Sequence, residues 1–268
     1  MSKKKEKPSA ELYDSLQTAY EHFNKHLFKG SLPAVLFTVQ RQAGTLGYFI
    51  PNRWSSPEGE LCHEIAINPT HIGSARVIEV LQTLVHEMVH CWQYNNGSSP
   101  SKGYHNKEWA YKMIEIGLHP SLTGKPGGEI VGMQMSDYVI DGGPFWEQSV
   151  ELIKNERFRL PWICRLSNTR PFSIATEQVT PDLVRPVPAS PSPLVVPESV
   201  KITETSPPTD FLFSSYQDLM PANTFFSPAP RGKAKSKYHC SGCNLNAWAK
   251  PGVRLKCADC DILLEEAE

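Results

Sequence analysis

The stretch His86-Glu87-Met88-Val89-His90 lies within a segment of helical periodicity that runs from about Ser74 to Asn95. An α-helix turns by about 100° per residue, so side chains four positions apart share one face. The apolar face of this helix would carry Val77, Leu81, Leu84, Val85 and Met88, and the polar face Glu79, Gln82, Thr83, His86, His90 and Gln93. The pattern predicts a helix whose apolar back rests on a core and whose polar face borders a cleft.

The spacing of the two histidines suits a metal site. Imidazoles at positions i and i+4 of a helix can bind one zinc ion, and the Glu after the first of them reaches a water on that ion. His86 and His90 are therefore predicted ligands of a catalytic zinc, and Glu87 is predicted to be a general base. The motif fixes only three residues and also occurs by chance. The helical frame and the partition of its faces favour the metal site.

A hydrolytic zinc needs a third protein ligand and one open position. His105 is a candidate at the start of a second helix, predicted from about residue 106 to 116. Glu108, one turn into that helix, is a rival, and spacing alone does not decide between them. Weaker candidates, in a strand or in turns without a partner at ligand spacing, are His63, His71 and His119.

The residues upstream of the motif predict a mixed fold. Helical periodicity runs from Ala10 to Leu27, and three strand candidates follow before the motif helix. These candidates are residues 34–39, 47–50 and 62–67. Helix, strands and then helices predict an α+β domain with a small antiparallel sheet beside the motif helix.

Four of the seven cysteines form two C-x-x-C pairs, Cys240 with Cys243 and Cys257 with Cys260. Two such pairs with 13 residues between them are typical of a tetrahedral four-cysteine zinc site. Four thiolates fill the coordination sphere, so this second zinc is expected to be structural. A module of this size has too small a core to fold alone, and the metal would supply its folding energy.

Composition divides the chain into three parts. Between Pro181 and Pro230 there are 11 prolines in 50 residues, which predicts an extended linker. We therefore expect a main domain with the predicted catalytic zinc site at 8–180, a flexible Pro-rich linker at 181–235 and a zinc ribbon at 236–268. The aromatic segment Phe211–Tyr216 inside the linker is interpreted as local packing on the domain, with a docking motif as the alternative.

Two parts of the chain resemble a known family. The motif His86–His90, together with Gly103-Tyr104-His105-Asn106-Lys107-Glu108-Trp109, is similar to the SprT-like zinc metalloprotease family (Spartan-related). That pattern has a third His closely preceded by Gly and an aromatic residue at the start of the next helix. The resemblance covers about residues 10–120 and also 236–268, where the cysteine pairs resemble the ribbon of many bacterial members. Asn106 departs from the pattern, because many members have Gly there.

The resemblance implies a zincin-like protease that hydrolyses peptide bonds with a zinc-activated water and Glu87 as general base. It also implies His105, rather than Glu108, as the third ligand. Substrate is expected to add a strand at the sheet edge near residues 65–67. Family members act on proteins crosslinked to DNA, so substrates associated with DNA are implied as well. Candidates for an oxyanion donor, without a positional argument for any of them, are Tyr104, Tyr138 and His119.

The segment from Arg231 to Lys256 holds seven basic residues and no acidic ones. Cations suit phosphate contacts and aromatic rings stack on bases, so contact with single-stranded nucleic acid is predicted for the ribbon. The alternative is a solvent-exposed face with Trp248 packed inside the module. The candidate contacts are Lys233, Lys235, Lys237, Trp248, Lys250, Arg254 and Lys256, with Tyr238 interleaved.

Whole-chain features exclude other classes. The formal net charge is −1, so a globally basic nucleic-acid binder is not indicated. No apolar run reaches the ~20 residues of a membrane helix, and the charged N-terminus lacks the apolar segment of a secretory signal. A cytoplasmic protein without a membrane partner is expected, with Cys62, Cys91 and Cys164 as buried thiols. The alternative function is a nucleic-acid-binding or regulatory zinc protein with a vestigial protease domain, which Glu87 disfavours. Oligomeric state and substrate stay open.

Overall fold

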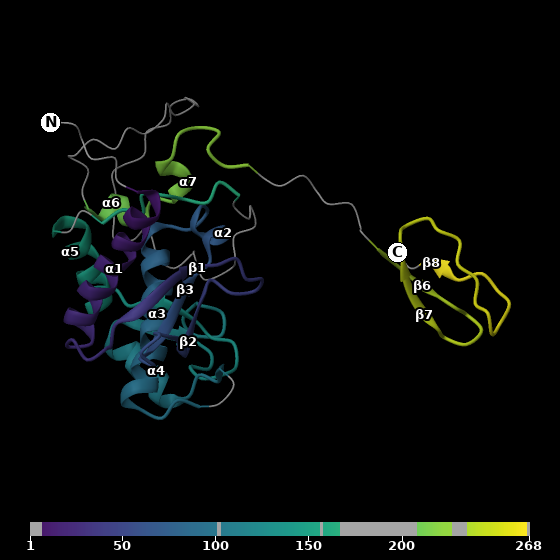
Figure 1. Ribbon diagram of the computed structural model, residues 1–268. Coiled ribbons are helices and arrows are strands. Elements are labelled where there is room, and N and C mark those ends of the chain that lie inside the picture. The colour runs from purple at the N-terminus through teal and green to yellow at the C-terminus, as the bar shows by residue number, and fades with distance from the viewer. Residues whose placement is uncertain (1–6, 101–102, 156–157, 167–207, 227–234, 267–268) are drawn as a thin grey trace. The chain divides into compact units, whose positions relative to one another are not determined.

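The computed structural model describes residues 7–100, 103–155, 158–166, 208–226 and 235–266 (Figure 1). The chain divides into two compact units, Met1–Phe226 and Ser227–Glu268, and each is described by itself. Among the helices within these described ranges, none combines the length and the hydrophobicity needed to cross a bilayer.

The first unit mixes helices and strands, which confirms the predicted α+β class. It begins with α1 (Pro8–Leu27), β1 (Val35–Val39), β2 (Gly47–Ser55), β3 (Leu61–Ile67) and α2 (Pro69–Ile72). The motif helix α3 (Val77–Asn96), α4 (Lys107–Glu115), β4 (Leu118–Ser121), β5 (Ser136–Val139) and α5 (Pro144–Asn155) follow. Two short helices, α6 (Pro208–Phe213) and α7 (Tyr216–Leu219), complete it.

The main sheet has the strand order β1-β3-β2, so β3 is its central strand. β2 pairs antiparallel with β3 through a short turn, whereas β1 lies parallel to β3 on its other side. The prediction of an antiparallel sheet is therefore wrong for β1. The expected strand addition near residues 65–67 is also wrong, because β3 already has a partner on both sides.

The motif helix α3 packs its apolar face into the core, as its periodicity predicted. The predicted apolar residues Val77, Leu81, Leu84, Val85 and Met88 are all buried. The helix begins at Val77 rather than near Ser74, because the carboxylate of Glu79 accepts the backbone N–H of Arg76 at 2.8 Å. This contact is half of a capping box and fixes the start of the helix.

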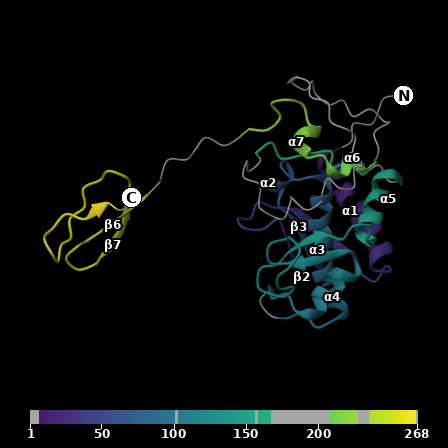
Figure 2. The ribbon, with the colours of Figure 1, turned by 180° about the vertical axis from the view of Figure 1, so that it is seen from behind.

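The predicted linker at 181–235 is wrong for residues 208–226, because these residues pack on the first unit. Leu212 and Tyr216 are buried in its core, and both views place α6 beside α1 and α5 (Figures 1 and 2). The Val77 N–H donates to the Ser214 carbonyl and the Tyr216 N–H to the Ala75 carbonyl, each at 3.1 Å. The first N–H groups of a helix lack partners within it, and this segment supplies one for α3. Local packing of Phe211–Tyr216 is thus confirmed, while residues 181–207 and 227–234 of the predicted linker lie outside the described residues.

Two truncations test how far the first unit extends. A chain that ends at Phe226 should keep the melting temperature of this unit. Ending it at Pro207 removes Leu212 and Tyr216 from the core, at a cost of about 4 kcal/mol. For a unit of this size that loss lowers the melting temperature by roughly 10 °C. Calorimetry of both chains checks this, and equal melting temperatures would show that residues 208–226 contribute nothing.

The second unit is a small antiparallel sheet of β6 (Ser236–His239), β7 (Asn246–Ala249) and β8 (Glu265–Glu266), in the order β7-β6-β8. Tyr238 of β6 is buried, and its hydroxyl donates to the carbonyl of Lys250 at 2.8 Å. This tyrosine, together with the buried Cys240 and Cys257, forms the interior of the unit.

Candidate metal centre

Three imidazoles converge beside α3. His86 and His90 lie one turn apart on this helix, and His105 directly precedes α4. One nitrogen from each ring lies within 4.8 Å of the other two. The Nε2 atoms of His90 and His105 are 3.2 Å apart, close to the about 3.3 Å expected for two nitrogens on one tetrahedral zinc. The three histidines form a group that could hold one metal ion.

Backbone pairing brings His105 to this position. Its N–H donates to the carbonyl of Gly132 at 2.8 Å, and the Gly132 N–H donates back at 3.1 Å. The His105 Nδ1 lies 3.2 Å from the same carbonyl, so a proton on Nδ1 leaves Nε2 for a metal. Asn106 caps α4 by accepting the N–H of Trp109 at 3.0 Å. The departure from Gly at 106 therefore gives the helix a cap and leaves the His105 backbone paired.

Glu108, the rival ligand, has a different role. Its carboxylate accepts the side-chain N–H of Gln93 and the backbone N–H of Ser98, each at 2.8 Å. A Cβ placed on Gly97 would lie only 2.6 Å from that carboxylate. Glu108 therefore secures the end of α3 and is absent from the three-histidine group. The other histidines considered from the sequence, His63, His71 and His119, do not join this group within the described residues either.

Asp137 of β5 is a site residue that the sequence did not reveal. It is buried, it accepts the Nδ1–H of His86 at 2.9 Å, and it accepts the side-chain N–H of Gln82 at 2.7 Å. A carboxylate behind a metal-binding imidazole fixes its tautomer and orientation. Burial alone would lower the pKa of His86, but the hydrogen bond to Asp137 and the charge of Glu87 raise it above its usual value. Asp137 lies 51 positions from His86, so only the tertiary fold reveals the contact.

Replacing Asp137 by Asn should weaken metal binding by about 10–100-fold, the usual cost of losing a partner behind a ligand. The amide keeps the size of the side chain but lacks the charge that orients the His86 N–H. Competition with a chromophoric chelator measures the affinity. The exposed Asp141, changed to Asn, is the matched control. Unchanged affinity in Asp137→Asn would mean that this carboxylate does not position His86.

The indole ring of Trp109 holds the three histidines in place. Trp109 is fully buried, and its ring centroid lies 4.3–5.5 Å from the centroids of all three imidazoles. Burial lowers the pKa of His105 to about 4 and that of His90 well below its usual value. Both rings are therefore neutral near pH 7, the form in which imidazole binds a metal.

Glu87 lies beside the histidines, at the floor of a cleft of about 870 Å³. Its carboxylate accepts the backbone N–H of Phe49 on β2, and burial raises its pKa to about 7. A Cβ on Gly47 would lie 2.8 Å from the carbonyl of Ala66 and 3.3 Å from the Glu87 Cγ, so only glycine allows this approach of β2 to α3. Of the three oxyanion candidates, Tyr104 lines the cleft, whereas Tyr138 and His119 stack on each other between β4 and β5.

The second unit brings its four cysteines together, with their sulfurs within 4.8 Å of one another. The 3.6 Å between the Cys243 and Cys257 sulfurs is close to the about 3.8 Å expected on one zinc. The two C-x-x-C loops repeat one backbone pattern: Asn244 N–H donates to Cys240 O at 2.9 Å, and Asp261 N–H to Cys257 O at 3.0 Å. The backbone N–H of Cys243 lowers the pKa of Cys240 to about 7, and the hydrogen bond to the Cys243 thiol raises the pKa of Cys260, so one of the four thiols ionises before the others. These sulfurs are a second group that could hold a metal ion.

The candidate nucleic-acid contacts fall into three groups. Lys237 and Trp248 are directly opposite in the β6–β7 pair and share one face, and Trp248 is 63% exposed. The alternative with Trp248 packed inside is therefore wrong. Tyr238 is buried and cannot stack on a base, and Lys256 pairs with Asp261 at 2.5 Å. Lys235, Lys250 and Arg254 are exposed, and Lys233 lies outside the described residues.

An α+β domain with H-E-x-x-H on one helix and a third histidine before the next defines a metalloprotease-like domain. The model of the SprT-like family matches residues 16–125, which include all three histidines. The resemblance to this family is therefore confirmed over that segment. The cysteine module lies outside it.

Two further comparisons give less coverage. A protein of Salmonella typhimurium, named "Uncharacterized protein in mucB 3'region", is 51% identical over 41 residues. That stretch is 15% of this chain and 55% of the relative, so the chain spans about half the length of that protein. No solved structure matches.

Proposed function

We propose that the protein is a zinc-dependent metalloprotease that hydrolyses peptide bonds at the three-histidine centre. The observation that carries this proposal is the convergence of His86, His90 and His105 beside the buried carboxylate of Glu87, inside one cleft. Three imidazoles with an open fourth position are a typical donor set for catalytic zinc. A bound zinc would supply a water of lowered pKa and polarise the scissile carbonyl.

The chain's own residues would do the remaining work. Glu87, buried beside the three imidazoles, would accept the proton of the attacking water and pass it to the leaving amine. Asp137 holds His86, and Trp109 supports the rings. Tyr104, which lines the cleft, is the candidate that stabilises the developing oxyanion.

Substrate would bind as an extended strand on β2 rather than on β3. β2 is the edge strand on the cleft side, and its residues from Gly47 to Phe49 and Pro51 line the cleft. Main-chain pairing with an edge strand recognises extended, unfolded peptides with little dependence on their side chains.

The direct test is incubation of the zinc-loaded protein with casein, as an unfolded substrate, and with DNA-binding proteins. Each mixture is prepared without DNA, with single-stranded DNA and with double-stranded DNA, and is scored on gels. Cleavage that stops on chelation and returns with zinc supports the proposal. Intact substrates in every mixture, with zinc bound, would favour the alternative of a vestigial domain in a regulatory zinc protein.

We also propose that the four cysteines hold a structural zinc and that the second unit contacts single-stranded DNA. The exposed Trp248 beside Lys237 favours this role, because a ring can stack on a base while the cation contacts the backbone. Action on DNA-associated or DNA-crosslinked proteins would follow if this unit keeps the protease near them. The cytoplasm, where thiols stay reduced, is the proposed location.

Removing residues 227–268 should lower the affinity for single-stranded DNA and leave the metal at the three histidines. Trp248→Ala alone should weaken binding by roughly 5–100-fold, since stacking on one base contributes about 1–3 kcal/mol. The affinity of the full chain should also fall steeply with salt. Fluorescence anisotropy at several salt concentrations measures these effects. Equal affinity without the second unit would assign any DNA contact to the protease-like domain.

A further inference from the structure

The edge strand beside the cleft changes direction abruptly. Between the paired positions Ile50–Glu64 and Trp54–Cys62, the three β2 residues 51–53 oppose the single β3 residue His63. Such a bulge bends a strand and interrupts its pairing, and bulges are frequent next to active sites. The bulge at 51–53 therefore separates a first half of β2, which borders the cleft, from a second half that does not.

The first half of β2 offers few groups to a pairing peptide. The carbonyl of Leu46 accepts the N–H of Asn68, so the backbone N–H and C=O groups of even-numbered positions point toward β3. Those of the odd-numbered Gly47, Phe49 and Pro51 point to the free edge of the sheet. The Phe49 N–H is bonded to Glu87, and proline has no N–H. The Gly47 carbonyl accepts the Thr45 hydroxyl, so the carbonyl oxygens of Phe49 and Pro51 are the remaining acceptors for a bound peptide.

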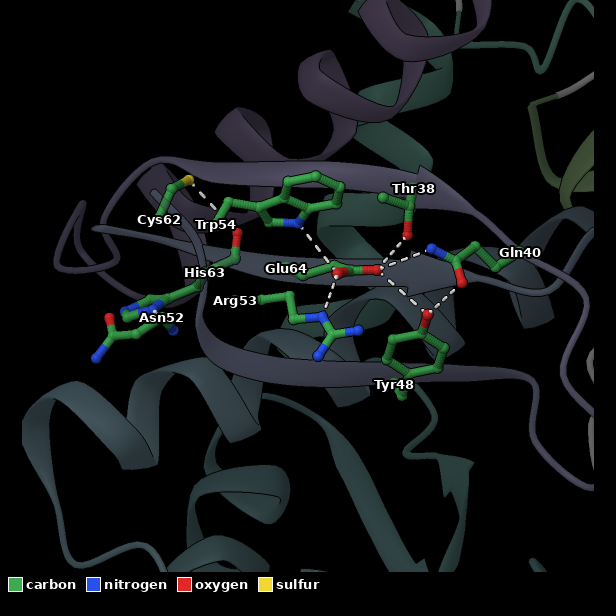
Figure 3. Close-up of polar contacts among 9 residues, drawn as sticks. All are labelled: Thr38, Gln40, Tyr48, Asn52, Arg53, Trp54, Cys62, His63 and Glu64. Carbon is green, nitrogen blue, oxygen red and sulfur yellow. Dashed lines mark hydrogen bonds and ion pairs between the residues drawn. The ribbon is translucent and has the colours of Figure 1, made fainter. Parts of the chain in front are cut away.

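Glu64 holds the bulge from the outer face of the sheet (Figure 3). Its side chain is only 2% exposed, and its carboxylate accepts hydrogen bonds from side chains on both neighbouring strands, β1 and β2. Thr38 and Tyr48 donate hydroxyl protons at 2.6 and 3.2 Å, and the Trp54 indole N–H donates at 3.0 Å. The guanidinium of Arg53, within the bulge, lies 3.9 Å from the same carboxylate. Glu64 therefore draws the chain after Pro51 onto the outer face, away from the cleft.

His63 holds the bulge from the inner face. Its Nδ1 accepts the backbone N–H of Asn52 at 2.9 Å, and Asn52 donates its side-chain N–H to the hydroxyl of Tyr94 at 3.0 Å. Asn52 has a φ of 50°, the left-handed conformation that Asn tolerates better than most residues. Tyr94 belongs to α3 and lines the cleft, so the bulge is tied to the helix that carries the metal centre.

We propose that the free edge of β2 pairs with an extended peptide only from Gly47 to Pro51, and that Glu64 and His63 set this limit by holding the bulge. This inference rests on the proposed function, because it concerns the peptide that the cleft would bind. Glu64 and His63 are positioning residues, since neither is expected to touch the peptide. The limit favours short unfolded segments. Two main-chain N–H groups of the peptide, two residues apart, would donate to the carbonyl oxygens of Phe49 and Pro51.

An N-methyl scan tests the limit. A fluorescein-labelled twelve-residue peptide of unstructured casein sequence is methylated at one backbone nitrogen at a time. Its binding to the zinc-loaded Glu87→Gln protein is measured by anisotropy. We expect two positions, two residues apart, to lose affinity by about 10-fold each, the loss of one hydrogen bond. The proposal would be overturned if methylation lowered the affinity at three or more alternate positions, or at no position. It would also be overturned if the parent peptide did not bind.

A variant tests the role of Glu64. In Glu64→Gln, the position opposite Pro51 should lose its sensitivity to methylation, to within about 2-fold, while the position opposite Phe49 keeps it. Arg53→Gln should act in the same direction, and it preserves the fold because Arg53 is 61% exposed. Glu60→Gln, an exposed change in the same hairpin, should leave the scan unchanged. A scan identical to that of the parent in both variants, or equal weakening at both positions, would overturn the positioning role.

Failure of the proposed function would look different. Wild-type protein would then leave the unmethylated peptide intact, while the scan, which reads binding alone, would still report the length of the paired edge.

Discussion

Replacing Glu87 by Gln is expected to leave the metal in place and to lower kcat/KM for peptide cleavage by roughly 10²–10⁴-fold, the contribution typical of a general base. The amide has the size of the carboxylate and can still accept the Phe49 N–H, but it cannot take a proton from water. Metal content by elemental analysis and cleavage of a casein peptide measure the two halves of this prediction.

Glu79→Gln is a suitable control for the same chemical change on the same helix face, because Glu79 lines the cleft outside the three-histidine group and Gln can still accept the Arg76 N–H that caps α3. Its metal content should equal that of the parent, and its cleavage rate should fall far less than that of Glu87→Gln. Cleavage by Glu87→Gln at the parent rate would contradict the assignment of the base.

Removal of the third histidine should have the largest effect on the metal. His105→Ala deletes one of three ligand atoms. The affinity for zinc should therefore fall by more than about 100-fold, which exceeds the loss expected when only a residue that hydrogen-bonds a ligand is removed. Glu108→Ala should keep the metal and instead lower the melting temperature, because the N–H groups of Gln93 and Ser98 lose their acceptor. Full occupancy in His105→Ala together with loss in Glu108→Ala would reverse the choice of ligand.

Local patterns made the motif helix α3 predictable. His86, Glu87 and His90 lie within five consecutive residues, and the apolar face of α3 follows from helical periodicity alone. His105 needed more, because its place depends on pairing with Gly132, 27 positions away, and the family resemblance had to choose it over Glu108. Asp137 carried no usable signal, since an acidic residue in a short strand has many ordinary roles.

Long-range pairing and packing account for the parts that the sequence did not predict. The strand candidates were in the right places, but the position of β1 on the far side of β3 depends on tertiary contacts rather than on alternation. Proline content predicted a linker through residues 208–226, although burial of Leu212 and Tyr216 outweighs that local preference. Aromatic residues between 211 and 216 were the one local sign of this packing.

The central claim is that one zinc ion at His86, His90 and His105 makes this protein a protease. Its most direct test is a zinc titration of the chelator-treated chain 1–226, which lacks the cysteine unit, with cleavage of a casein peptide as the readout. Activity should be absent without metal, rise in proportion to added zinc, and stop rising at one equivalent. Cleavage that persists without metal, or zinc that binds at one equivalent without any cleavage, would contradict the claim.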